Sequence, residues 1–103
     1  MVKFKLKIEQ NALQDIQGIT DWYTIQLQNL GSRFQKQAKF TINSLKTNPH
    51  NYAVRYADVH CVGIKKFPFL VHYTIDDEAL IVSIFAILHT SRNPKIWETR
   101  KNI

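Results

Sequence analysis

Residues 69–88 read FLVHYTIDDEALIVSIFAIL, two apolar runs separated by three consecutive acidic residues. The first run alternates in the manner of a strand with one polar face, and the second is apolar at nearly every position. A strand that is apolar on both sides belongs inside a sheet that is covered on both faces. The acidic residues at 76–78 suit the turn of a hairpin, so this stretch predicts two adjacent antiparallel strands.

The residues before this hairpin predict one further strand and two helices. Residues 2–8, VKFKLKI, alternate apolar residues with lysines and predict a strand with one solvated face. If this strand lies at the margin of a sheet, its lysines would discourage edge-to-edge aggregation. Over residues 11–30 the apolar positions recur every three or four residues, which predicts a helix that Gly31 would terminate. Ser32 would then begin a second helix and complete a helical hairpin. The inner face of that second helix carries Phe34, Ala38, Ile42 and Leu45.

The remaining segments complete the predicted fold. Residues 54–58 and 61–67 have moderate strand character, and Pro94 fits the first turn of a short C-terminal helix. The expected fold class is α+β with the order β-α-α-β-β-β and a short final helix. The helical hairpin is expected to pack on a largely antiparallel sheet, within one domain spanning residues 1–103.

Charge and composition restrict the function. The formal net charge of +6 favours an anionic partner, either nucleic acid or an acidic protein. No apolar run approaches the length of a membrane span, and a single cysteine, Cys61, cannot form an internal disulfide. We therefore expect a cytoplasmic protein without a membrane partner. His50, His60 and His72 lack the spacing of a metal site, so we expect neither a metal nor another cofactor.

From Lys65 to Trp97 the chain reads KKFPFLVHYTIDDEALIVSIFAILHTSRNPKIW. This aromatic-Pro-aromatic stretch, the V-x-Y-x-I strand, the acidic turn and the ending His-x-x-Arg-x-Pro-x-x-Trp resemble the RelE/ParE superfamily of bacterial toxins. The resemblance implies the toxin of a type II toxin–antitoxin module, which inhibits growth until a cognate antitoxin, encoded in the adjacent gene, covers it. RelE-like members cut messenger RNA in the ribosomal A site, whereas ParE-like members poison DNA gyrase. We expect the antitoxin to be acidic, since this chain is basic.

Several residues could serve such a toxin. If the chain is a nuclease, it is metal-independent, with His89 exchanging protons and Arg92 binding phosphate. Cationic residues that could hold a phosphate or a target are Arg55, Lys65, Lys66 and Arg92. A regular hairpin centred on Asp77 would place His89 opposite Lys65 and Lys66. Tyr73 could stack on a base, although its alternation with Val71 and Ile75 also fits a core position.

Each of these residues also has a purely structural interpretation. His89 could simply end a strand, Arg92 could anchor the last helix, and Lys65 and Lys66 could be solvated strand lysines. RelE-like enzymes, by resemblance, carry an arginine at the start of the strand that here begins with Phe69, and this chain lacks it. Three hypotheses follow: a ParE-like gyrase inhibitor, which we favour, a RelE-like endoribonuclease, and a basic RNA-binding domain that shares only the fold.

Overall fold

The structure is a computed structural model that describes residues 2–91. Its elements are β1 (Lys5–Ile8), α1 (Gln10–Gln26), α2 (Gln28–Ser44), the short 3₁₀ helix η1 (Pro49–Asn51), β2 (Val54–Tyr56), β3 (Val59–Gly63), β4 (Phe69–Asp76) and β5 (Ile81–His89). The predicted C-terminal helix, with Arg92 and Trp97, lies outside the described residues.

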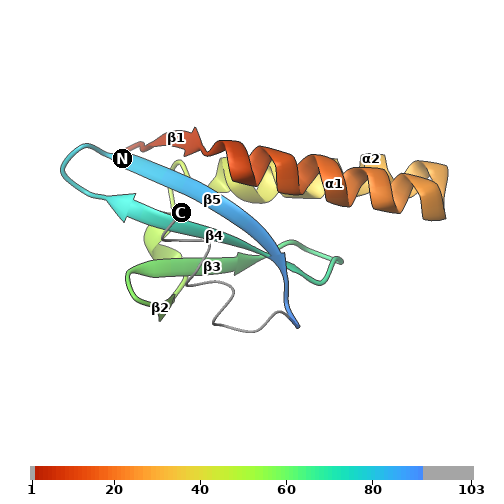
Figure 1. Ribbon diagram of the computed structural model, residues 1–103. Helices are drawn as coiled ribbons and strands as arrows, with labels where there is room; N and C mark the ends of the chain where they lie inside the picture. Colours follow the sequence, from red (N-terminus) through yellow and green to blue (C-terminus); the bar gives the residue numbers. More distant parts are fainter. Residues whose placement is uncertain (1, 92–103) are drawn as a thin grey trace.

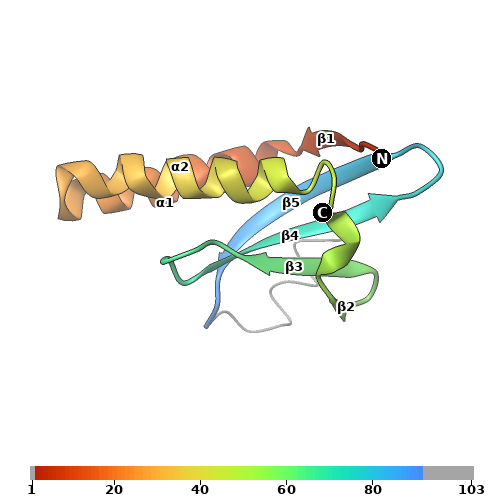
Figure 2. The ribbon, with the colours of Figure 1, turned by 180° about the vertical axis from the view of Figure 1, so that it is seen from behind.

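The strands form one sheet in the order β1-β5-β4-β3-β2. β1 runs parallel to β5, and all other neighbouring strands are antiparallel. The α1–α2 hairpin lies along one face of this sheet and extends beyond its end (Figures 1 and 2). The predicted α+β class is therefore confirmed, as is the order of a strand, two helices and then strands, with four strands after the helices where the predicted order had three. β1 lies at one margin of the sheet, where its lysines can discourage edge-to-edge pairing.

The boundary between the helices lies at Leu27 rather than at Gly31. Leu27 is extended, with φ −160° and ψ 120°, and α2 begins at the next residue. Gly31 is instead inside α2 and against α1, where an added Cβ would lie 2.0 Å from Thr24 Oγ1 and 2.7 Å from the Thr20 carbonyl oxygen. The predicted cap was wrong because Leu27 and Leu30 continue the apolar spacing of α1 across the break. Glycine at position 31 allows the two helices to approach closely.

The core lies between the helical hairpin and the sheet. The residues predicted for the inner face of α2 are all buried, and they pack with strand residues in one cluster that includes Val71, Tyr73, Val82 and Ile84. The opposite face of the sheet carries a smaller cluster of Ala86, Leu88, Tyr56, Leu70 and Phe85. Both faces of β5 therefore carry apolar side chains, as the sequence indicated. None of the helices within residues 2–91 is long and apolar enough to cross a bilayer.

An irregularity in the β4–β5 pairing changes which way the end of β5 faces. Tyr73 pairs with Ile84 and His72 pairs with Ala86, so Phe85 is an extra residue on β5. Such a bulge reverses the alternation of side chains beyond it. Ile84 before the bulge and Ile87 after it consequently both belong to the cluster under the helices. His89, two residues further, lies on that same side of the sheet.

The outer edge of β5 is completed by a helix side chain. β1 ends at Ile8, and the Glu9 amide donates to the Ile84 carbonyl at 2.8 Å. Further along, the Ile87 amide donates to Asp15 Oδ2 of α1 at 2.9 Å. The Asp15 carboxylate thus accepts the hydrogen bond that a backbone carbonyl of a longer β1 would have accepted. This bond attaches α1 to the C-terminal half of β5.

Candidate functional site

The start of β4 and the end of β5 meet at one end of the sheet. Phe69 pairs with His89, and the Thr90 amide donates to the Pro68 carbonyl at 2.9 Å. The turn from β3 to β4 lies at the same end, beneath the helical hairpin (Figure 1). Residues far apart in the sequence are therefore held together on paired strands, which position side chains more accurately than a loop does.

The predicted pairing of His89 with Lys65 and Lys66 is wrong. β3 ends at Gly63, and a turn closed by the Ile64 amide donating to the Phe69 carbonyl at 3.0 Å contains both lysines. Lys66 has φ 73°, the left-handed conformation of a tight turn. The hairpin turn after Asp76 is longer than expected and Phe85 adds a residue, so the strand partner of His89 is Phe69. Both lysines are exposed at this end of the sheet.

The His89 ring is held by Ser91, two residues further along the chain. Nδ1 accepts a hydrogen bond from the Ser91 amide at 3.1 Å, and Ser91 Oγ lies 2.8 Å from the same nitrogen. Because an amide N–H can only donate, Nδ1 must carry a lone pair, and the proton of the neutral ring sits on Nε2. In this arrangement His89 is a hydrogen-bond donor through Nε2, and taking up a proton at Nδ1 would break the contact with the Ser91 amide.

A pocket of about 530 Å³ opens beside His89. We call it the strand-tip pocket, and it is lined by Trp22, Tyr23, Pro68, Phe69, His89 and Ser91. Neither Trp22 nor Tyr23 was predicted as a site residue, and Tyr23 is one of the regularly spaced apolar positions that predicted the helix over residues 11–30. No local sequence pattern marks either residue as part of a site, because their approach to β5 depends on how α1 packs across the sheet. Partial burial raises the pKa of the Tyr23 hydroxyl.

The other predicted site residues lie elsewhere. Arg55 is on β2, next to the start of β3, whereas the turn with Lys65 and Lys66 follows the end of β3. Tyr73 is fully buried and donates its hydroxyl proton to the Pro49 carbonyl at 2.7 Å, so its side chain cannot reach a target and the target-binding role is corrected to a core role. Burial raises the pKa of the Tyr73 hydroxyl far above its usual range.

The thiol of Cys61 is buried on the face of the sheet away from the helices. Burial raises its pKa to about 11, although the Arg55 guanidinium acts in the opposite direction. His72 Nδ1 lies 3.4 Å from the Cys61 sulfur and 3.0 Å from the Tyr56 hydroxyl. A thiol in this setting stays protonated at neutral pH and is a packing group rather than a nucleophile.

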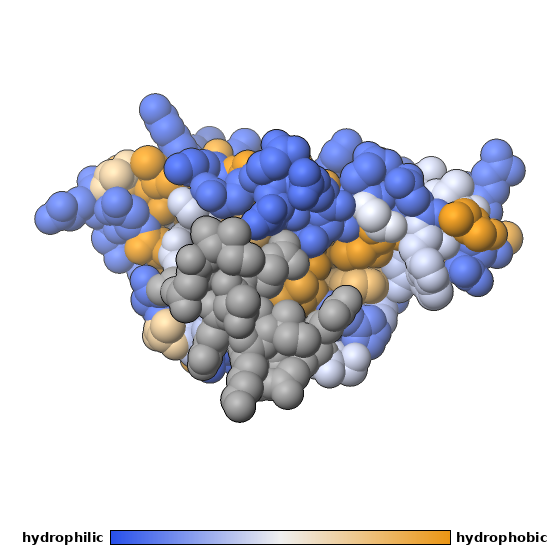
Figure 3. Space-filling view, viewed as in Figure 1, coloured by the Kyte–Doolittle hydropathy of each residue, from blue (hydrophilic) through white to orange (hydrophobic). Residues whose placement is uncertain are grey.

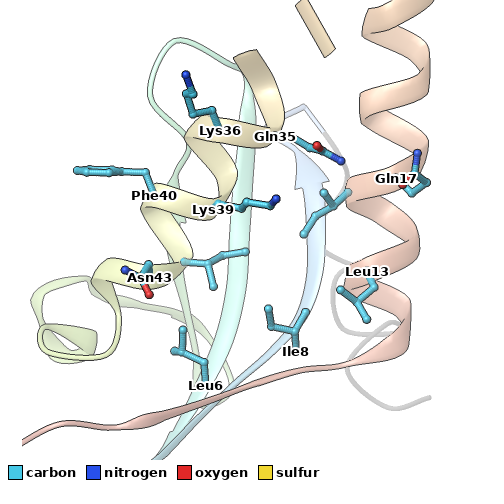
Figure 4. Close-up of a pocket in the computed structure, with 11 residues that line it drawn as sticks. Leu6, Ile8, Leu13, Gln17, Gln35, Lys36, Lys39, Phe40 and Asn43 are labelled. Carbon is cyan, nitrogen blue, oxygen red and sulfur yellow. The ribbon is translucent and has the colours of Figure 1, made fainter. Parts of the chain in front are cut away.

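A second concave surface runs along the helical hairpin. This hairpin groove has a volume of about 770 Å³ and is lined by Leu6, Ile8, Leu13, Ile16, Gln17, Gln35, Lys36, Lys39, Phe40, Ile42 and Asn43. Leu6 and Ile8 of β1 form its apolar floor beside Leu13 of α1, and Lys39 and Gln35 reach in from α2 (Figure 4). Phe40 stands at the rim and is 74% exposed. The groove therefore combines apolar walls with a cationic rim.

The free end of the hairpin is apolar too. Ile25 and Leu27 are 81% and 58% exposed, and hydrophobic atoms gather at this end of the molecule, on the right of Figure 3. Trp22, one helical turn before Ile25, connects this surface with the strand-tip pocket. Contiguous exposed apolar patches, in contrast to single exposed side chains, are typical of surfaces that bind a partner.

Comparison with known families gives one decisive match. The family model for the ParE toxin of the type II toxin–antitoxin system parDE matches residues 6–94. The chain belongs to the ParE toxin family. The matched range includes the strand-tip pocket and the whole hairpin groove, so both surfaces are parts of the ParE family domain. Comparison with curated proteins gives no significant match.

Solved structures show the same fold. The chromosomal ParDE system from P. aeruginosa matches with a TM-score of 0.74 and 15% identity, over 84% of this chain and 96% of that one. A mutant of E. coli toxin RelE in the free state matches with a TM-score of 0.68 and 19% identity, over 100% and 99%. The RelBE2 toxin–antitoxin complex from Mycobacterium tuberculosis matches with a TM-score of 0.60 and 20% identity, over 86% and 93%. The fold is thus common to ParE and RelE proteins, while the family model singles out ParE.

Proposed function

We propose that this ParE-family chain arrests growth by binding DNA gyrase, without cutting RNA. The observation that carries this proposal is the hydrogen bond from the Ser91 amide to His89 Nδ1. A nuclease needs a base that takes the 2′-hydroxyl proton and an acid that supplies one to the leaving oxygen. His89 with Nδ1 engaged and a proton on Nε2 is suited to neither step. Membership of the ParE family supports the same conclusion.

Induced expression of the chain tests this proposal against its alternative. We expect growth arrest, double-strand DNA breaks, a DNA-damage response and intact messages. Purified chain should also inhibit supercoiling by purified gyrase. Messenger RNA cut at translating ribosomes, with gyrase unaffected, would overturn the proposal. His89→Ala then gives a second test, because a catalytic His89 predicts a loss of cleavage of about 10²-fold or more.

The nuclease hypothesis retains one supporting observation. Lys65 and Lys66 are exposed at the same end of the sheet as His89, where cations could bind a scissile phosphate. We set aside the third hypothesis, an RNA-binding domain that shares only the fold. The match of the ParE family model over residues 6–94 is a similarity in sequence and not in fold alone. The induced culture separates the first two hypotheses because each predicts a different lesion.

An antitoxin is the expected partner, and we propose the hairpin groove as its docking site. The structures from M. tuberculosis and P. aeruginosa are of a toxin–antitoxin complex and a ParDE system. Leu6, Ile8 and Leu13 would receive apolar side chains of an amphipathic segment, while Lys36 and Lys39 would pair with its acidic residues. The net charge of +6 would accelerate the encounter with an acidic chain.

Association kinetics test this docking site. Lys36→Glu with Lys39→Glu should slow association with the product of the adjacent gene and weaken its dependence on salt. Lys3→Glu with Lys46→Glu is the matched control, because it changes the net charge equally at exposed positions outside the groove. Equal slowing by both double variants, or association rates indifferent to ionic strength, would contradict the proposed site.

A further inference from the structure

The strand-tip pocket has walls made almost entirely of rings. Trp22 and Tyr23 have ring centroids 5.1 Å apart at 74°, and Phe69 and His89 have centroids 5.2 Å apart at 82°. Tyr23 joins the two pairs, with its centroid 6.2 Å from that of Phe69. All three contacts are edge-to-face, so neighbouring rings of the wall are set at steep angles to one another.

Two of these walls, Tyr23 and Phe69, are held from behind by the core. Phe34 is fully buried, and its ring centroid lies 5.7 Å from those of both Tyr23 and Phe69. Phe67 contacts Tyr23 from the turn, at 5.2 Å between centroids. A pocket whose walls are already ordered binds a rigid planar group with little further loss of conformational entropy.

We propose that the strand-tip pocket binds a nucleobase, with the attached phosphate lying against Lys65 and Lys66. Trp22 is 57% exposed at the mouth of the pocket, which leaves much of its indole free to stack. Aromatic side chains beside cationic groups are the combination that holds unpaired bases, because every base has a π face and every nucleotide a negative charge.

The polar groups of the pocket suit a base rather than an apolar side chain. With Nδ1 occupied by Ser91, the proton of His89 lies on Nε2 and can be donated to a ring nitrogen or carbonyl oxygen. A leucine or phenylalanine from a protein partner would offer no acceptor to this N–H. Lys66 and Lys65 are exposed and precede Pro68, a residue of the pocket wall, by two and three positions, so that they can supply positive charge beside the pocket.

This pocket does not depend on the identity of the toxin's target. A nucleobase could come from a single-stranded segment of DNA or RNA or from a free nucleotide, since the chemistry of recognition is the same. Binding to purified chain and lesions in an induced culture are separate measurements, so failure of one leaves the other intact.

Binding to the purified full chain tests the proposal. The probes are short fluorescein-labelled oligoadenylates of DNA and RNA, an abasic DNA strand of equal length and charge, and unlabelled AMP as competitor. We expect both oligoadenylates to bind more tightly than the abasic strand. Quenching of Trp22 fluorescence in a Trp97→Phe background should accompany binding. Competition by AMP as strong as that by unlabelled oligoadenylate identifies a free nucleotide as the ligand, and weaker competition identifies a strand.

Substitutions locate the binding to the pocket. Trp22→Ala should raise the Kd for oligoadenylate about fivefold or more, while Trp22→Phe should retain most of the affinity. Ile25→Ala is the matched control, since Ile25 is exposed on the same helix outside the pocket. Lys65→Gln with Lys66→Asn should reduce the salt dependence, and asparagine tolerates the left-handed backbone at position 66.

Two results would overturn the proposal. Equal affinity for the abasic strand and the oligoadenylates would mean that only backbone charge is recognised. An unchanged Kd in Trp22→Ala, with circular dichroism showing a folded chain, would exclude stacking in this pocket.

Discussion

Substitution of alanine for each of the two helical glycines should change the stability of the fold in opposite directions. Gly18 in α1 has no atom within 4 Å of an added Cβ, whereas at Gly31 the added atom would lie 2.7 Å from the Thr20 carbonyl oxygen. Ordinary contact begins at 3.4 Å, so Gly31→Ala forces α2 away from the backbone of α1. Thr24 Oγ1, at 2.0 Å, must also move, although a side chain can rotate away.

The magnitude follows from two terms. Alanine stabilises a helix interior by about 1 kcal/mol relative to glycine, and both variants gain this. Only Gly31→Ala also has the overpacking cost, typically about 1–3 kcal/mol. Gly18→Ala should therefore raise the free energy of unfolding by about 1 kcal/mol, and the difference between the two variants should be about 2 kcal/mol. In a domain of this size that separates the Tm values by roughly 8–16 °C.

Thermal and urea denaturation of the two variants provide the measurement. Thr24→Ala in the Gly31→Ala background should recover part of the loss, because it removes the atom nearest to the new Cβ. Gly31→Asn distinguishes close packing from a helix cap. Asparagine would be tolerated better than alanine in a left-handed cap, and tolerated worse against a neighbouring helix. Equal stabilisation by Gly18→Ala and Gly31→Ala would refute the packing argument.

Three further predictions concern a half-buried carboxylate and two buried polar groups. Asp15→Ala removes the acceptor of the Ile87 amide and should destabilise the fold by about 1–3 kcal/mol, with faster hydrogen exchange at that amide; unchanged exchange would contradict the bond. Tyr73→Phe should lower the free energy of unfolding by about 1 kcal/mol, because it removes the hydrogen bond to the Pro49 carbonyl, and should leave growth inhibition intact. A stable variant without toxicity would restore a target-binding role for Tyr73. The pKa of Cys61 is about 11 in the folded chain against an ordinary 9.0, so the unfolded thiol ionises first. Stability should therefore fall as pH rises from about 9 to 11, and Cys61→Ala should remove this part of the pH dependence in denaturation measured across that range.

Much of the fold could be predicted because the apolar pattern has two clear periods. Alternation identified β1 and β4, and spacing of three to four residues identified the buried face of α2, from Phe34 to Leu45. The boundary between the helices could not be read in this way. Leu27 interrupts the hydrogen bonding without interrupting the apolar spacing, so only the backbone geometry reveals the break.

The site was harder to predict than the fold. A hairpin register depends on turn length and on bulges. The longer turn after Asp76, together with the extra residue Phe85, placed His89 opposite Phe69 instead of the lysines. Trp22 and Tyr23 approach His89 through helix–sheet packing, which connects positions more than sixty residues apart and leaves no local pattern. The sequence was compatible with either a target-binding or a core role for Tyr73, and its complete burial shows that it is a core residue.

The extra residue Phe85 has a consequence for comparing toxins of this fold. Relatives that lack the equivalent insertion would present the opposite set of side chains at the tip of the same strand. A histidine or arginine aligned with His89 by letter alone could then project from the other surface of the sheet. Before a residue of a relative is taken as the equivalent of His89, the residues between it and the position of Ile84 should therefore be counted. That count shows whether the two side chains lie on the same face of the sheet.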